Sequence, residues 1–171
     1  MENVKIQLLC PRIGWEVGPS ANSRRFFAIT TNGDPQNIDI VRSIIAEAPT
    51  LPNWDIFAGR PRRPYNDEII FQNQRGQQRL VCLSDWRYVL TAFDSGRFFD
   101  VAIATDVPLQ MDESARQQLL RTTVEFALGE LLVMKRIDRM SFVDHPDSQW
   151  EWRSTPFAHV ASHLDSLTMV E

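Results

Sequence analysis

The chain has 171 residues, of which 43% are hydrophobic and 23% are charged, and its net charge at pH 7 is −4. These are ordinary values for a globular protein, and a domain of this size buries about 70% of the surface that its unfolded chain exposes. We therefore expect one domain over residues 1–171. The acid excess argues against a non-specific nucleic-acid binder, which would normally be basic, and favours a partner with a basic surface.

The sequence also bears on the compartment of the protein. No run approaches the ~18 apolar residues that are needed to span a bilayer, so no membrane association is expected. Residues 1–15 lack the basic-then-apolar layout of a signal peptide, which favours a cytoplasmic protein. Cys10 and Cys82 have no CxxC spacing. In the cytoplasm they are expected as reduced, buried thiols, with a disulfide or a reactive thiol as the alternatives.

The first half of the chain predicts a strand–helix–strand unit. A loosely alternating segment at residues 4–9 is a candidate strand, and the β-branched and aromatic run at residues 25–31 is a clearer one. Asp34 suits the cap of a helix and Pro35 its first position. The helix has apolar residues at a regular helical spacing, which are Ile38, Val41, Ile45 and Ala48. Pro49 ends it, and residues 54–58 predict the next strand.

The middle of the chain reads as an antiparallel meander. Strands are predicted at residues 68–73, 79–83, 88–93 and 98–104, with hairpin turns inside the first and the second pair. In the last strand Phe99, Val101 and Ile103 share one face. One side of this sheet is therefore expected to face the core.

Two further helices are predicted in the C-terminal half. Asp112 suits a helix cap and Gly129 a helix end; the buried stripe between them comprises Leu119, Thr123, Phe126 and Ala127. Thr155 and Pro156 are predicted to start the last helix, and residues 131–137 to form a strand. Runs of strands with helices set apart predict an α+β fold, with a mostly antiparallel sheet and about three helices packed on one face.

Three arginines form the first candidate site. Arg60, Arg62 and Arg63 flank Pro61, which stiffens the loop. They are candidates to bind a phosphate or an acidic partner surface. In the alternative the loop is solvated and its arginines pair with nearby acids such as Asp67 and Glu68.

A tryptophan pair forms the second candidate site. Trp150 and Trp152 lie in a polar segment, residues 144–153. If this segment is extended, both rings lie on one side. That arrangement predicts either a lid over the core or a contact patch for a partner.

A histidine pair is the third candidate. His159 and His163 are four residues apart on the last predicted helix, with Asp144, His145 and Asp165 close in sequence. Two histidines and a carboxylate can hold zinc or iron. However, the segment HVASH lacks the glutamate of the HExxH motif, and histidines at this position commonly serve as amphipathic surface residues.

Motifs that would indicate catalysis are missing from the sequence. There is no GxSxG, P-loop, GxGxxG or paired CxxC motif, so no cofactor is expected. Glu125 and Glu130 are not spaced as an acid pair on one helix face. Glu130 is instead expected to be a structural hydrogen-bond partner or a helix-end residue.

Two short motifs carry a resemblance to a family. The segment 46–63 has AP at Ala48–Pro49, then Leu51, Trp54 and FAGRPR at residues 57–62, and ALGE follows at residues 127–130. With these motifs the chain resembles an uncharacterised bacterial domain family, of the DUF695-like kind. Gly59 departs from the family pattern. The family has no agreed activity, so the resemblance implies no catalytic residues.

These observations favour a non-enzymatic, protein-binding module. Its most concrete form is an immunity-type or accessory protein that masks a basic bacterial toxin or effector with an acidic surface bearing Trp150 and Trp152. One alternative is a small-molecule or anion-binding protein that uses Arg60, Arg62 and Arg63. A second alternative is a metal-dependent enzyme that uses His159 and His163.

Overall fold

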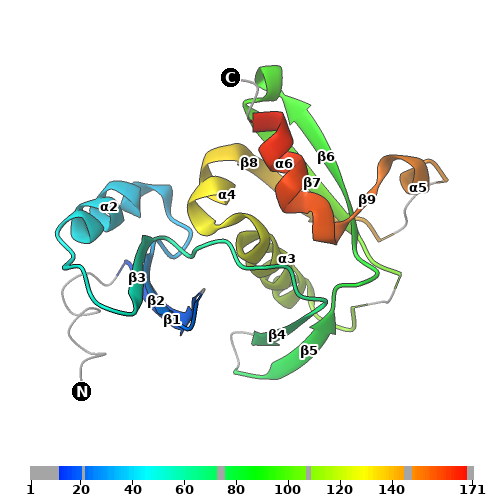
Figure 1. Ribbon diagram of the computed structural model, residues 1–171. Coiled ribbons are helices and arrows are strands. Elements are labelled where there is room, and N and C mark those ends of the chain that lie inside the picture. Colours follow the sequence, from blue (N-terminus) through cyan, green and yellow to red (C-terminus); the bar gives the residue numbers. More distant parts are fainter. Residues whose placement is uncertain (1–11, 21, 73–75, 107–108, 145–147, 169–171) are drawn as a thin grey trace.

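The computed structural model describes residues 12–20, 22–72, 76–106, 109–144 and 148–168. The strand expected at residues 4–9, Cys10 and His145 lie outside these ranges. The α+β class is confirmed, and the strands are divided among three sheets. Figure 1 shows these sheets and their helices as two lobes, which we call the N-terminal lobe (residues 12–58) and the C-terminal lobe (residues 68–168).

The N-terminal lobe is built on a three-stranded sheet in the order β1-β2-β3, with β1 (Gly14–Pro19), β2 (Arg25–Thr30) and β3 (Trp54–Ala58). β2 and β3 are parallel and are joined through η1 (Pro35–Asn37) and α2 (Ile38–Ala46), which confirms the predicted strand–helix–strand unit. Asp34 caps η1 as expected, because its Oδ1 accepts the Gln36 backbone N–H at 2.9 Å. A small core of Ile13, Ile29 and Val41 holds the helix to the sheet.

The C-terminal lobe combines a hairpin, a four-stranded sheet and several helices. The hairpin pairs β4 (Glu68–Gln72) with β5 (Gln78–Cys82). The sheet has the order β8-β7-β6-β9, with β6 (Arg87–Phe93), β7 (Phe98–Ala104), β8 (Ile137–Phe142) and β9 (Thr155–Pro156). The helical segments are η2 (Asp94–Gly96), α3 (Glu113–Leu128), α4 (Glu130–Arg136), α5 (Trp150–Arg153), η3 (Phe157–His159) and α6 (Val160–Thr168).

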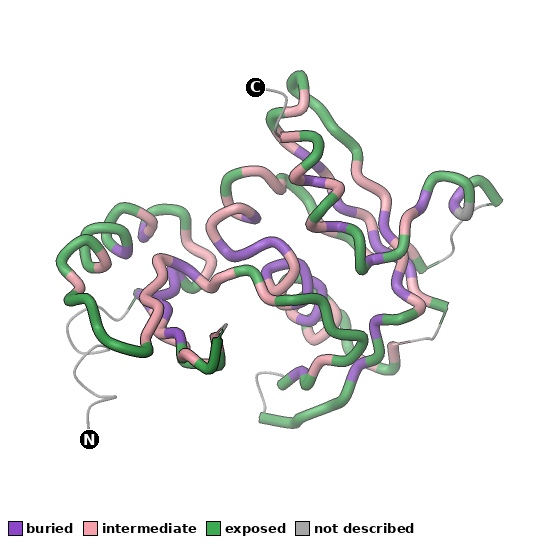
Figure 2. The backbone as a smooth tube through the Cα atoms, viewed as in Figure 1, coloured by how far each residue is buried: buried purple, intermediate pink, exposed green. Residues whose placement is uncertain are grey.

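The main core lies between this sheet and its helices. Phe99, Val101 and Ile103 on β7 are at most 1% exposed, as their shared face predicted. Leu119 of α3 and Leu164 of α6 pack into the same core. In Figure 2 the buried segments gather along β7 and α3, and separately around β2 in the N-terminal lobe. Within the described residues no helix is long and apolar enough to cross a membrane.

Three local predictions were wrong. Residues 131–136 lie in α4 rather than in a strand, and only Ile137 belongs to a strand, as the first residue of β8, because a short apolar run does not distinguish the two structures. Thr155 and Pro156 do not start the last helix, since they pair with β6 as strand β9. Cys82 is exposed rather than buried, because it ends the two-stranded hairpin on its outer face.

Candidate functional site

The arginine loop, residues 59–63, joins the two lobes. At one end the Gly59 N–H donates to the Ile29 carbonyl of β2 at 2.8 Å. At the other end the Arg63 N–H donates to the Phe126 carbonyl of α3, also at 2.8 Å. The backbone of this loop is therefore anchored to both lobes, and its three arginines lie at the junction.

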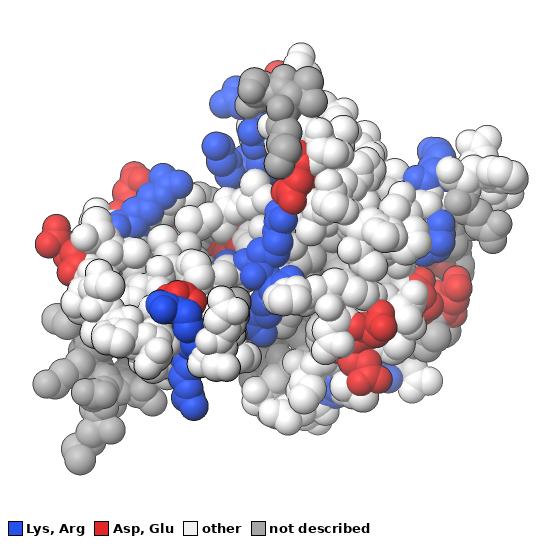
Figure 3. Space-filling model, viewed as in Figure 1, with Lys and Arg blue, Asp and Glu red and all other residues white. Residues whose placement is uncertain are grey.

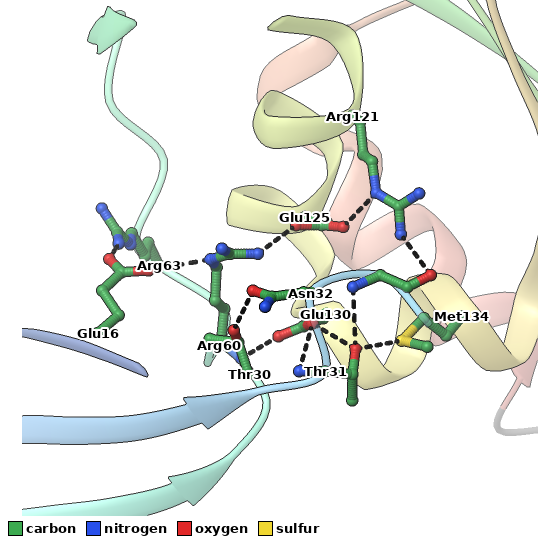
Figure 4. A network of polar contacts seen from close by, with 11 residues as sticks. Glu16, Thr30, Thr31, Asn32, Arg60, Arg63, Arg121, Glu125, Glu130 and Met134 are labelled. Carbon is green, nitrogen blue, oxygen red and sulfur yellow. Dashed lines mark hydrogen bonds and ion pairs between the residues drawn. The ribbon is translucent and has the colours of Figure 1, made fainter. Parts of the chain in front are cut away.

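Glu130 fixes the same junction from α4 (Figure 4). Its side chain is 0% exposed. Oε1 accepts the backbone N–H of Thr31 at 3.0 Å and the Thr31 hydroxyl at 2.6 Å, and Oε2 accepts the Arg60 N–H at 2.9 Å. The Glu130 N–H in turn donates to the Arg60 carbonyl at 2.9 Å. The expected role of Glu130 as a structural hydrogen-bond partner is confirmed, and this carboxylate ties residues of both lobes together.

Arg60 extends this network from its side chain (Figure 4). Nε donates to Glu16 of β1 at 3.0 Å, and Nη1 donates to Glu125 of α3 at 2.9 Å. Glu125 is 3% exposed, and it also accepts from Arg121 Nε at 2.7 Å. Glu125 and Glu130 thus contact the same arginine, although their sequence spacing does not indicate it.

Arg62 and Arg63 each have a carboxylate partner as well. Arg62 binds Asp165 of α6 through two hydrogen bonds of 2.7 and 2.8 Å, and these bonds lower the pKa of Asp165. Arg63 pairs with Glu16, and its guanidinium carbon lies 3.8 Å from the centroid of the Phe126 ring. The three arginines therefore have carboxylate partners, but these are distant in sequence and are not the expected Asp67 and Glu68.

A cavity of about 570 Å³ lies between the lobes beside this loop. Ligand pockets in proteins commonly span about 300–1,000 Å³. Its walls are largely apolar and come from β1, β2, β4, α3, η3 and α6, with Val17, Phe26, Ile69, Phe126, Phe157 and Ala161 among the lining residues. We call it the apolar compartment. Arg63 lines it as well.

A second hollow of about 390 Å³ adjoins the first. Ile70 and Phe126 line both, and we call the two hollows together the interlobe cleft. Glu16, Arg60 and Arg121 line this second, polar compartment. The arginine loop therefore contributes to both hollows, with Arg63 in the apolar one and Arg60 in the polar one.

Exposed apolar side chains surround the cleft. Val17 is 49% exposed, Tyr65 40% and Ile70 69%. Leu80, which is 59% exposed, lies opposite Ile70 in the β4–β5 hairpin. Large apolar surfaces on a soluble protein commonly mark interaction sites. Sequence reasoning missed this rim, although the consecutive residues Ile69, Ile70 and Phe71 place apolar side chains on both faces of β4.

One glycine keeps the cleft wall close-packed. A Cβ added to Gly18 would lie 2.5 Å from the Phe26 ring, whereas van der Waals contact requires more than 3 Å. Both residues line the apolar compartment. A side chain at Gly18 would therefore displace the Phe26 ring.

The tryptophan pair is not arranged as expected. Trp150 and Trp152 lie on the short helix α5 and not on an extended segment, so residues two apart point in different directions. Trp150 is 8% exposed and Trp152 is 90% exposed. Trp150 is thus a buried residue, and only Trp152 is free to contact a partner.

The two histidines have different surroundings. His163 Nδ1 lies 2.8 Å from the Tyr88 hydroxyl, and burial raises the pKa of Tyr88 to about 12. His159 is exposed on η3. Asp165 and Asp144 bind Arg62 and Arg116. Among the described residues no three histidine, cysteine, aspartate or glutamate side chains are grouped to hold a metal ion.

In comparisons with protein-family models, with curated proteins and with solved structures, nothing matches this chain. Function is therefore inferred from the geometry of the interlobe cleft and of the surfaces around it.

Proposed function

We propose that the protein is a non-enzymatic binding module that holds an extended segment of a partner protein in the interlobe cleft. The observation that carries this proposal is the apolar compartment, which adjoins exposed apolar side chains of both lobes. Apolar side chains of a partner would fill the compartment. The backbone of the partner would lie across the rim formed by Val17, Tyr65 and Ile70.

The strands at the rim favour an extended partner. Among the described residues β1 pairs only with β2, and β4 pairs only with β5. Within the described part of the chain each has one edge without a neighbouring strand, and such an edge can hydrogen bond to an added peptide. With a net charge of −4, a basic partner would associate faster. An immunity-type protein that masks a basic toxin or effector is one form of this function.

A pair of matched variants tests the proposal. The protein is used as bait after in-cell cross-linking, and the captured proteins are compared between variants. Ile70→Glu places a charge at the rim, whereas Ile44→Glu changes the same residue type on α2, where Ile44 is 38% exposed and does not line the cleft. We expect Ile44→Glu to capture the same partner as the wild type and Ile70→Glu to lose it. Equal capture by both variants would place the interface elsewhere.

The surface around Trp152 is a second candidate binding surface. Its ring is 90% exposed, and exposed tryptophans are typical contact residues in interfaces. Trp152→Ala tests it alone. Its free energy of unfolding should stay within about 0.5 kcal/mol of the wild type, so a loss of partner binding would be specific. Trp150→Ala is unsuitable for this test, since truncating a buried tryptophan costs about 3 kcal/mol or more.

The arginine loop supports an anion site less well. Its three arginines already have carboxylate partners, so a phosphate would have to compete with Glu16 and Asp165. The loop is better suited to position the lobes and to line the cleft.

A further inference from the structure

We infer that the protein pairs with a second copy of itself along the open edge of β6 (Arg87–Phe93) and forms a symmetric dimer. This surface lies outside the interlobe cleft, because the described residues that line the cleft do not include any from β6. Such a dimer goes beyond the proposed function and does not depend on it. Three features support it, which are the backbone groups of the edge, its side chains and the charges at its two ends.

The open edge of β6 starts where β9 ends. One side of β6 pairs with β7 along its whole length, from Arg87 to Phe93. The other side pairs with β9, which covers only Arg87 and Tyr88. In Figure 1 the chain that precedes β9 runs away from the sheet towards α5. Within the described residues no strand therefore pairs with residues 89–93 on that side.

The backbone groups of two residues point to this open edge. The Phe157 N–H donates to the Trp86 carbonyl at 2.8 Å, on the side of β6 where β9 lies. Along a strand the backbone groups of alternate residues point to the same side. Those of Leu90 and Ala92 therefore point to the open edge, where an added strand can hydrogen bond to them.

The open edge carries none of the features that normally prevent strand pairing. Natural sheets protect their edges with charged side chains, prolines or bulges. The other edge strand of the sheet, β8, has exposed charges at Asp138 and Arg139 and a shift in register beside them. Residues 89–93 are Val-Leu-Thr-Ala-Phe, without a charge or a proline. In Figure 3 the surface over β6, between α6 and α5, is likewise white. This edge is therefore open to pairing with another strand.

The side chains of the edge are complementary to themselves. In an antiparallel pair of β6 strands, a twofold axis at Thr91 places this residue opposite itself. Leu90 then lies opposite Ala92 of the second copy, and the two exchange backbone hydrogen bonds in both directions. Val89 lies opposite Phe93, on the same face as Thr91. Aromatic–β-branched and threonine–threonine pairs are among the cross-strand pairs that stabilise sheets.

The length of the open edge also fits a second copy. One end is set by β9, and the other is set by Asp94, where φ is 49° and the chain turns into η2. In the symmetric pair each strand therefore turns away after Phe93, at the point where β9 covers the other strand. A longer straight strand would meet β9 there.

Opposite charges lie at the two ends of the edge. At the β9 end, Arg87 donates to the hydroxyl and the carbonyl of Ser154, which are neutral groups. At the other end, the Asp94 side chain is 58% exposed and lies 3.8 Å from Arg97. Antiparallel pairing brings Asp94 of each copy to the Arg87 end of the other. Complementary charges favour one partner and one orientation, and the twofold axis produces this contact twice.

Sedimentation equilibrium of the full chain tests the dimer. Small interfaces bind weakly, so the protein concentration is raised to about 1 mM. We expect the mean mass of the wild type to rise from that of one chain towards that of two. Thr91→Lys places like charges opposite each other at the axis and should raise the dissociation constant about tenfold or more. The control is Ser141→Lys on β8 of the same sheet, which should leave it unchanged. Both positions are exposed, so both variants should keep the fold of the single chain.

Cross-linking tests the register of the two strands. Residues that face each other without mutual hydrogen bonds have Cα atoms about 4.5 Å apart, a distance that a disulfide can span. Thr91→Cys, in a chain that also carries Cys10→Ser and Cys82→Ser, should therefore form a disulfide-linked dimer on mild oxidation. Ser141→Cys in the same background should stay largely monomeric.

Three results would overturn the inference. They are the mass of a single chain at every concentration, equal association of the wild type and Thr91→Lys, and cross-linking through Ser141→Cys in preference to Thr91→Cys. A dimer that Thr91→Lys weakens and that Thr91→Cys links covalently supports it, whichever partner the cleft binds.

Discussion

Glu130 uses both of its carboxylate oxygens on groups outside its own helix. It is 0% exposed, and its acceptors are filled by Thr31 of the N-terminal lobe and by Arg60 of the loop. A buried carboxylate is tolerated when its hydrogen bonds are complete. Because these hydrogen bonds are complete, replacing the carboxylate would disrupt them and lower the stability of the fold.

Glu130→Gln should therefore lower the free energy of unfolding by about 2 kcal/mol. The glutamine amide has nearly the same shape, but its NH₂ group would face an N–H or O–H donor on one side. Urea denaturation measures the change. The control is Glu113→Gln on the first turn of α3, where the side chain is 70% exposed, and its cost should stay below about 0.5 kcal/mol. Equal stability of Glu130→Gln and the wild type would exclude this role.

The Arg62–Asp165 pair has a predictable pH dependence. Hydrogen bonds from Arg62 hold the pKa of Asp165 below its ordinary value. The pair therefore stabilises the folded state above the pKa of an unfolded aspartate, about 3.9, and this contribution is lost as the pH falls through the lower folded pKa. Because both side chains are more than a third exposed, the contribution should be below about 1 kcal/mol.

Comparing the wild type with Asp165→Asn tests this sign. The stability difference between the two proteins should be largest near pH 7 and should shrink towards pH 3. A difference that grows on acidification would contradict the assignment of the lowered pKa to the Arg62 hydrogen bonds.

The break between α3 and α4 positions Glu130. Gly129 has a φ of +84°, which a residue with a Cβ adopts only with strain. A Cβ there would also lie 3.3 Å from the Arg62 backbone nitrogen. The glycine therefore lets the arginine loop approach the point where one helix ends and the next begins.

Gly129→Ala should destabilise the protein by about 1–3 kcal/mol. Gly96→Ala is a matched control, because Gly96 has a similar φ of +83° and no heavy atom within 4 Å of an added Cβ. It carries the backbone strain without the close contact. We expect the loss of stability to be larger for Gly129→Ala in the same denaturation assay. A larger loss for Gly96→Ala would show that the contact with the loop is unimportant.

The elements with local signals were predictable from the sequence. The strand–helix–strand unit follows from Asp34, Pro35 and the periodic apolar residues, and the β6–β7 hairpin follows from its alternating pattern. α4 was not predictable in this way, because its apolar run suits a strand equally well. α5 was missed because its four residues are too short to show a helical period.

The candidate site was predictable only in part. The arginine loop stands out in the sequence, and Arg63 and Arg60 do line the two compartments. Their partners could not be identified, because Glu16, Glu125 and Asp165 come from β1, α3 and α6. Thr123 looks like one more residue of a buried helix stripe. In the structure it is 1% exposed and lines the apolar compartment, which only the fold shows.

At the scale of the whole molecule, two apolar cores meet across a polar junction. Ile13, Ile29 and Val41 form one core, and the larger one lies under β6 and β7. Between them lie the Glu130 network (Figure 4) and the interlobe cleft. A ligand in the cleft would contact both lobes at once, so binding should also hold the lobes in one relative position.

Hydrogen–deuterium exchange of the protein with and without its captured partner tests the binding cleft most directly. We predict slower exchange of the backbone amides in β1 (Gly14–Pro19) and β4 (Glu68–Gln72), because the partner would cover their open edges. Exchange in α2 (Ile38–Ala46) should not change. Protection confined to α2 or to α5, with β1 and β4 unchanged, would contradict the assignment of the cleft as the binding site.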